Sequence, residues 1–175
     1  NYYSTRGGEA HVVEEEIRML KKQGHEVITC FRDSSVIDTL PWWKKIGLFL
    51  SSFHNPGAVR EIKDIIDRYS PDIAHIHNVF PLLSPAVYKI LHKEGIPVVQ
   101  TLHNFRFLCI NGLLHHHGNP CSAGGFSLRC IRRRCLHNSL LDSLWYTILI
   151  GYHRWRGTFT HCIDRYIALN TFTRQ

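Results

Sequence analysis

The sequence predicts an α/β fold with a mostly parallel sheet and helices on both of its faces. Apolar, β-branched segments alternate along the chain with segments whose apolar residues recur every three or four positions. The stretch Val98–His103 begins as a strand buried on both faces and turns polar at His103 and Asn104. Because ligands of open α/β sheets bind just outside the carboxyl ends of strands, we expect the chemistry there. The 175 residues, 44% hydrophobic and 20% charged, suit a single globular domain.

The first predicted elements are a helix over about Glu9–Lys22 and a strand over His25–Phe31. One face of the helix is apolar, acidic residues come early and lysines late, and Gly24 is a plausible residue to end it. A loop follows, with a short strand near Val36–Ile37. The next segment, Trp42–Phe53, combines Trp-Trp-Lys-Lys with four apolar residues. It reads either as an amphipathic helix at a membrane interface or, as we favour, a helix packed against the protein's own sheet.

Two Asx/Ser-Pro pairs mark the starts of the central helices. Asn55-Pro56 predicts an N-cap with proline in the first turn, and Ser84-Pro85 repeats this signature. The strands between and after them are expected at Asp72–His77 and Val98–His103. Both therefore end in a histidine at the same edge of the sheet.

The last third of the chain contains the longest loop and the longest helix. Residues 104–138 are irregular and rich in Gly, Cys, His and Arg, and such loops are usually functional or disordered. Ser139–Trp155 has a wide apolar face, which predicts a mostly buried helix. A final strand is expected at Arg165–Leu169.

The net charge of +7 is unevenly distributed. Residues 1–100 contain 12 basic and 12 acidic residues, residues 101–175 contain 9 basic and 2 acidic ones, and none of residues 101–141 is acidic. This favours either an anionic partner or a plain solvated basic face. The run Arg132–Arg134 lacks any accompanying nucleic-acid motif, so we expect no nucleic acid as partner. The sequence shows neither a signal peptide nor a transmembrane stretch.

Four of the six cysteines lie in the long loop: Cys109, Cys121, Cys130 and Cys135. Such thiolates can hold a structural Zn²⁺, although the familiar Cys-x2-Cys spacing is missing. Because no secretory signal is present, a disulfide framework is the weaker interpretation. The three consecutive histidines at 115–117 can substitute for one ligand or simply be solvated. Cys30 and Cys162 are expected to be inert core thiols.

Several short motifs, in their order and spacing, resemble the N-terminal, acceptor-side domain of a GT-B glycosyltransferase of family 4, the retaining "group 1" type. The motifs are Asn1-Tyr-Tyr, Arg6-Gly-Gly-Glu, Pro71-Asp-Ile-Ala-His-Ile-His-Asn, Pro81-Leu-Leu-Ser-Pro, Pro97-Val-Val-Gln-Thr-Leu-His-Asn-Phe-Arg, Cys109 with Asn111-Gly112, Pro120-Cys121, Cys135 with His137-Asn138-Ser139, and Asp164-Arg-Tyr-Ile-Ala-Leu-Asn. The likeness covers nearly the whole chain. It departs at Gly124, where relatives often have a cysteine.

The resemblance implies a Rossmann-like, doubly wound domain over residues 1–175. Family members begin with an apolar strand just before the residue that matches Asn1, and they continue into a second domain that holds most of the nucleotide-sugar site. We therefore expect this chain to be a fragment that lacks the first strand and the C-terminal domain, and to be inactive alone. The implied reaction moves a sugar from a UDP- or GDP-sugar to a hydroxyl of a glycan, lipid-linked saccharide or cell-envelope precursor, and it requires no cofactor. The implied location is cytoplasmic, with peripheral contact at the membrane.

The resemblance also implies roles for particular residues. Gly7 and Gly8 precede a helix N-terminus and face the donor phosphates; alternatively they form a plain turn. His103 is expected as the catalytic residue that touches the donor sugar or orients the acceptor, although a histidine that only caps the strand is an alternative. Arg106 is expected to pair with a phosphate or to be a surface arginine.

The acceptor side is assigned to His77, Asn78 and Asn104, while His75 is expected to be a satisfied structural histidine. For His77 a hydrogen bond that organises the following loop is an equally good interpretation. Two other functions compete with the enzyme: a non-catalytic binding module of the same fold and, on charge alone, a basic nucleic-acid-binding domain.

Overall fold

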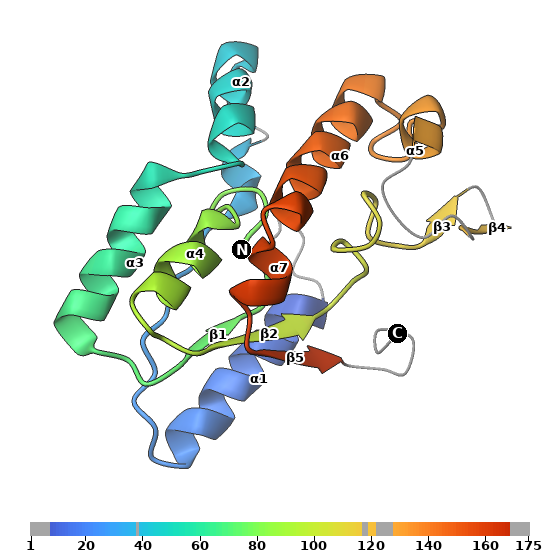
Figure 1. The fold of residues 1–175 in the computed structure, drawn as a ribbon. Helices are drawn as coiled ribbons and strands as arrows, with labels where there is room; N and C mark the ends of the chain where they lie inside the picture. Colours follow the sequence, from blue (N-terminus) through green and yellow to red (C-terminus); the bar gives the residue numbers. More distant parts are fainter. Residues whose placement is uncertain (1–7, 38, 117–118, 122–127, 169–175) are drawn as a thin grey trace.

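The computed structural model describes residues 8–37, 39–116, 119–121 and 128–168 (Figure 1). Its main sheet has three parallel strands in the order β1 (Ala74–Ile76), β2 (Val98–Leu102) and β5 (Arg165–Ala168). The central strand β2 pairs Val98 with Ala74 on one side and Leu102 with Ala168 on the other. Because β2 is covered on both faces, Val98 is buried together with the polar side chains Gln100 and Thr101.

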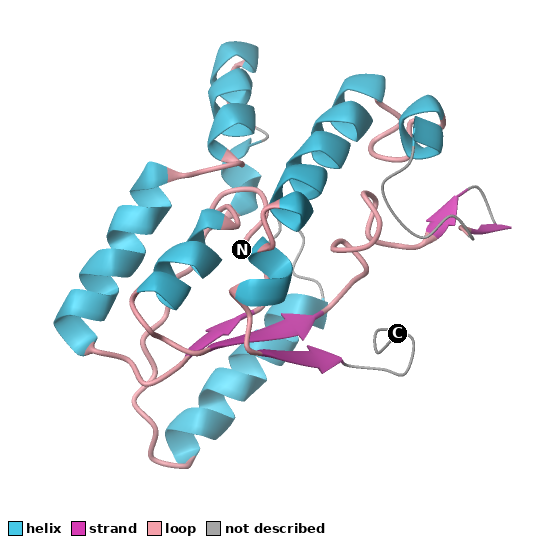
Figure 2. Cartoon of the chain, viewed as in Figure 1, coloured by secondary structure: helices cyan, strands magenta, loops and turns pink. Residues whose placement is uncertain are grey.

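Helices cover both faces of this sheet. The helix α1 (Gly8–Lys22) lies on one face, and α3 (Pro56–Tyr69), α4 (Ala86–Lys93) and α7 (Thr158–His161) lie on the other (Figures 1 and 2). The predicted α/β architecture is therefore confirmed. The main apolar core lies among α4, β2 and α6 (Leu140–Trp155), with Tyr88, Val98, Ile110, Leu149 and Ile150 fully buried.

Both predicted central helices form, but only one of the two predicted caps is confirmed. Asn55 caps α3, since its Oδ1 accepts hydrogen bonds from the backbone N–H groups of Gly57 and Ala58. Ser139 caps α6 in the same way. Ser84 is not a cap, because Pro85 occupies that position; its hydroxyl instead accepts a hydrogen bond from the backbone N–H of Asn55 at 3.0 Å. The sequence signature thus fixed the place of the helix but not its capping contact.

The strand expected over His25–Phe31 is wrong. These residues form no strand, because no described strand lies beside them to pair with their backbone groups. The short strand expected near Val36–Ile37 is also wrong, and η1 (Ser34–Ile37), a 3-10 turn, replaces it. Within the long loop the structure describes only short elements: β3 (His115–His116), β4 (Asn119–Pro120) and α5 (Leu128–Arg132).

The aromatic helix α2 (Trp42–Ser51) and the long helix α6 leave apolar surface uncovered. Contrary to expectation, α2 does not pack on the sheet: it stands clear of it (Figure 1), and its Phe49 ring meets Trp145 of α6 edge-on at 5.5 Å. The prediction of a mostly buried α6 is also wrong, because only one stripe of that helix faces the core. Its exposed apolar residues are Leu140, Leu141, Leu144, Ile148, Tyr152 and Trp155. In the described part of the chain, no helix has the length and hydropathy needed to cross a bilayer.

Candidate functional site

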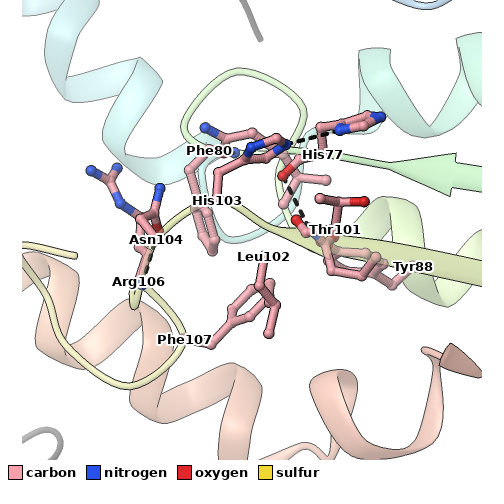
Figure 3. A pocket seen from close by; sticks show the side chains of 12 residues that line it. His77, Phe80, Tyr88, Thr101, Leu102, His103, Asn104, Arg106 and Phe107 are labelled. Atoms are coloured by element: carbon pink, nitrogen blue, oxygen red, sulfur yellow. Dashed lines mark hydrogen bonds between the residues drawn. The ribbon is translucent and has the colours of Figure 1, made fainter. Parts of the chain in front are cut away.

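A small recess opens at the carboxyl ends of β1 and β2, where the sequence placed the chemistry (Figure 3). Its volume is about 20 Å³, room for roughly one water molecule, so a larger ligand must lie across its mouth. The polar residues that line it come from both strand ends and from the loop after β2: His77, Asn78, Gln100, Thr101, His103, Asn104 and Arg106. Five of the predicted site residues thus lie together.

His77 and His103 form the centre of this group. Nδ1 of His77 lies 2.9 Å from Nε2 of His103, and the centres of the two tilted rings are 5.2 Å apart (Figure 3). Burial lowers the pKa of His77 to about 3, helped by the neighbouring His75 and His103. Burial and His75 also lower the pKa of His103. Both imidazoles are therefore uncharged at neutral pH and offer one donor and one acceptor each.

The backbone behind His77 is held by buried side chains. Nε2 of Gln100 donates to the carbonyl oxygen of His77 at 3.0 Å, and the Tyr88 hydroxyl donates to Oε1 of Gln100. Gln100 and Tyr88 are almost completely buried. Because these partners fix the strand end, the His77 ring has little freedom to move.

The helix α1 contributes two carboxylates that sequence analysis did not assign to the site. Glu16 contacts both histidines of β1's end: its Oε1 lies 3.0 Å from Nδ1 of His75, and its Oε2 lies 3.4 Å from Nε2 of His77. Glu9, two turns earlier, hydrogen-bonds Asn78 and lies within electrostatic range of Arg106. Burial raises the pKa of Glu9, and these two neighbours partly offset it. The sequence did contain one indication of their shared role: Glu9 and Glu16 are seven residues apart, which puts both carboxylates on one face of the helix.

Arg106 lines the recess and is braced by α6. Its Nη1 donates to the hydroxyl of Tyr146 at 3.1 Å, and its guanidinium lies 5.4 Å from the centre of that ring. The backbone N–H of Arg106 donates to Oδ1 of Asn104 at 2.9 Å. Asn104 therefore shapes its own loop, in addition to the acceptor contact expected from its place in the sequence.

Asn78 is also used locally, since its Oδ1 accepts a hydrogen bond from the backbone N–H of Phe80 at 2.9 Å. Gly8 is the first residue of α1, whose start faces the site through Glu9. Gly7 lies outside the described residues. His75 is half-buried and hydrogen-bonded through Nε2 to Thr101 at 2.8 Å, as expected for a satisfied histidine.

None of the four loop cysteines lines the recess, and three of them affect the titration of the fourth, Cys135. Burial raises the pKa of Cys135 to about 11, and Cys130, Cys109 and Cys121 contribute in that order. Sγ of Cys135 also lies 3.7 Å from Nδ1 of His116. All six cysteines are free thiols. Among the described residues, the one tight grouping of possible metal ligands is instead Glu16, His75 and His77, whose ligand atoms lie within 4.8 Å of one another.

Comparison with known proteins supports the resemblance in the motifs. A family model described as Glycosyltransferase Family 4 matches residues 6–175. No curated protein and no solved structure matches the chain. The match spans the α/β domain and every described residue of the recess. The chain therefore belongs to Glycosyltransferase Family 4.

Proposed function

We propose that this chain is the acceptor-side domain of a retaining glycosyltransferase. The complete enzyme transfers a sugar from a UDP- or GDP-sugar to a hydroxyl of a glycan, a lipid-linked saccharide or a cell-envelope precursor. The observation that supports this most is the uncharged His77–His103 pair at the strand ends, beside Arg106. The proposal assigns most of the nucleotide-sugar site to a second domain of the same protein.

The proposed chemistry requires positioning and charge stabilisation more than a protein nucleophile. In a front-face mechanism the leaving diphosphate departs from the side on which the acceptor hydroxyl attacks. His103 then hydrogen-bonds the donor sugar or orients the acceptor hydroxyl, while His77, Asn78 and Asn104 line the acceptor side. For the developing charge on the diphosphate, the proposal assigns Arg106 and the backbone amides of Gly7 and of Gly8, the first residue of α1.

The test is the variant His103→Ala in the full-length enzyme. We expect turnover to fall about a hundred-fold or more, since one positioned hydrogen-bonding group is typically worth that much. The matched control is His115→Ala, because His115 is an exposed histidine in the same loop, outside the recess. Circular dichroism and thermal unfolding check that the fold persists. Near-normal turnover of His103→Ala would refute the assignment.

We also propose that the enzyme works at the cytoplasmic face of a membrane. α2 and α6 would contact the lipid surface there without crossing it. The exposed apolar residues of α2 are Trp43, Ile46, Phe49 and Leu50, and next to them α6 exposes its own apolar stripe. No acidic residue occurs in α2, whereas Lys44 is exposed. An apolar face with basic neighbours complements an anionic lipid surface.

For the long loop we propose a structural Zn²⁺ held by Cys109, Cys121, Cys130 and Cys135. The proposal is supported by the clustering of these four cysteines in one loop and by the electrostatic effect of Cys130, Cys109 and Cys121 on the Cys135 thiol. His116 is close enough to Cys135 to be an alternative ligand. Such an ion would hold the irregular segment that follows the recess in one conformation.

A further inference from the structure

A continuous row of polar side chains connects α1 to the recess. It runs from Oε2 of Glu16 to Nε2 of His77, at 3.4 Å, and from Nδ1 of His77 to Nε2 of His103, at 2.9 Å. The Glu16 and His77 side chains are 24% and 15% exposed, so solvent screens their interaction only partly. The row ends at His103, whose ring lines the recess (Figure 3).

The chemistry of these groups dictates where the protons lie. A carboxylate oxygen can only accept a hydrogen bond, and an uncharged imidazole has one N–H and one lone pair. The proton of His77 therefore lies on Nε2, facing Glu16, and its Nδ1 presents a lone pair. His103 must then donate from Nε2, which leaves its own Nδ1 unprotonated. The opposite order would direct the lone pair of His77 Nε2 at the carboxylate.

Glu16 is itself held in place by a second histidine. Its other oxygen lies 3.0 Å from Nδ1 of His75, and Nε2 of His75 lies 2.8 Å from the hydroxyl of Thr101, a buried residue of β2. The carboxylate is thus fixed by both rings rather than by one. The centres of the His75 and His77 rings are 4.5 Å apart, so both rings can contact the carboxylate of Glu16.

We infer that Glu16 and His77 are positioning residues that set the tautomer of His103, so that His103 presents an unprotonated Nδ1 as a hydrogen-bond acceptor. The described part of the chain places no hydrogen-bond partner on that nitrogen. Its use by a substrate rests on the proposed function: Nδ1 accepts a hydrogen bond from a sugar hydroxyl and so orients it. This inference involves no covalent step.

The tautomer can be measured without knowing the substrate. Long-range ¹H–¹⁵N correlation spectra of the histidine side chains, with His103 assigned from a His103→Gln variant, report which nitrogen of His103 is protonated. We expect Nε2–H in the wild-type protein. In Glu16→Gln, whose amide can donate as well as accept, the Nδ1–H form should increase several-fold, and Glu16→Asp should restore part of the wild-type pattern.

The matched control is Glu15→Gln. Glu15 is the neighbouring carboxylate, but it is exposed and pairs with Arg18, away from the recess. The substitution Glu15→Gln should leave the His103 spectrum unchanged. Two results would overturn the inference: a wild-type His103 protonated on Nδ1, or a Glu16→Gln spectrum identical to that of the wild type.

A bound metal would also overturn it. Glu16, His75 and His77 are close enough to hold a divalent cation, which would need the lone pair of His77 Nε2 and would reverse the order of protons. Adding Zn²⁺ during the same measurement tests this. We expect no stoichiometric binding that Glu16→Gln abolishes; such binding would replace the tautomer assignment with a metal site.

In the full-length enzyme, Glu16→Gln should lower kcat about ten-fold with little change in the KM of the donor, and Glu16→Asp should recover part of the loss. The two proposals fail separately. If His103→Ala is fully active while the spectra behave as expected, the proposed function fails and the tautomer assignment stands. If His103→Ala is inactive but Glu16→Gln leaves the spectra and kcat unchanged, only the role of Glu16 fails.

Discussion

The buried histidine of α6 makes the stability of this domain depend on pH. His153 is 1% exposed. Its Nε2 lies 3.1 Å from the carbonyl oxygen of Phe53 and donates to it, and its Nδ1 lies 3.2 Å from the hydroxyl of Thr158, from which it accepts. Burial, with a smaller contribution from Lys89, lowers the pKa of His153 from 6.5 to about 4. The neutral ring therefore uses both nitrogens, and acid should remove this arrangement.

The direction and the size of the change in unfolding free energy with pH follow from the pKa of His153 in the folded and in the unfolded chain. The unfolded chain binds a proton at His153 below its ordinary pKa of 6.5, whereas the folded domain resists protonation until the pKa of about 4. Unfolding therefore takes up a proton in this window, and stability falls as the pH falls. Between about pH 7.5 and about pH 5, the loss due to this residue alone is roughly 2 kcal/mol.

The measurement is the free energy of unfolding in urea at both pH values, for the wild type and for His153→Gln. Glutamine can donate to Phe53 and accept from Thr158 but does not titrate in this range. The lowered pKa values of His77 and His103 affect both proteins equally and so cancel in the difference. We expect the wild type to lose about 2 kcal/mol more than His153→Gln over this interval. An equal loss in the two proteins would show that His153 is not the neutral, buried group described here.

Two further predictions concern the loop and the outer helices. Protein purified without metal-affinity resin should contain about one equivalent of Zn²⁺ per chain. The variant Cys135→Ser should lower this zinc content, whereas the control Cys162→Ser, outside the four loop cysteines, should not. Metal analysis that finds no zinc in the wild type would refute the zinc site. In a sedimentation assay, the double variant Ile46→Ser, Leu50→Ser should bind vesicles of anionic lipid roughly ten-fold more weakly than the wild type. The control Leu113→Ser, at another exposed leucine, should bind like the wild type. Equal binding of all three proteins would refute membrane contact.

The local parts of the fold could be predicted from the sequence because their causes are local. Asn55 followed by proline specifies a capped helix start, and the apolar run Val98–Leu102 specifies a strand buried on both faces. The change to polar residues at His103 likewise located the recess, since strand ends of a parallel sheet meet at one edge. The alternation of strand and helix was sufficient for the architecture.

The errors arose where an outcome depends on a partner elsewhere in the chain. His25–Phe31 has strand-like residues, but no described strand lies beside it to complete its hydrogen bonds. The wide apolar face of α6 indicated burial, yet only the stripe that contains Leu149 and His153 meets the core, while Leu141 remains 74% exposed. Periodicity tells which side chains share a face but not whether another element covers that face.

The sequence by itself determined the α/β class, the family and the placing of His77 and His103 at neighbouring strand ends, because motif order and strand periodicity are written along the chain. Only the tertiary structure brought Glu16 against these histidines. That contact depends on how α1 crosses the sheet, which packing decides, and a carboxylate 61 residues from His77 gives no local sign of its partner. The proton order at the candidate site thus depends on a contact that exists only in the folded chain.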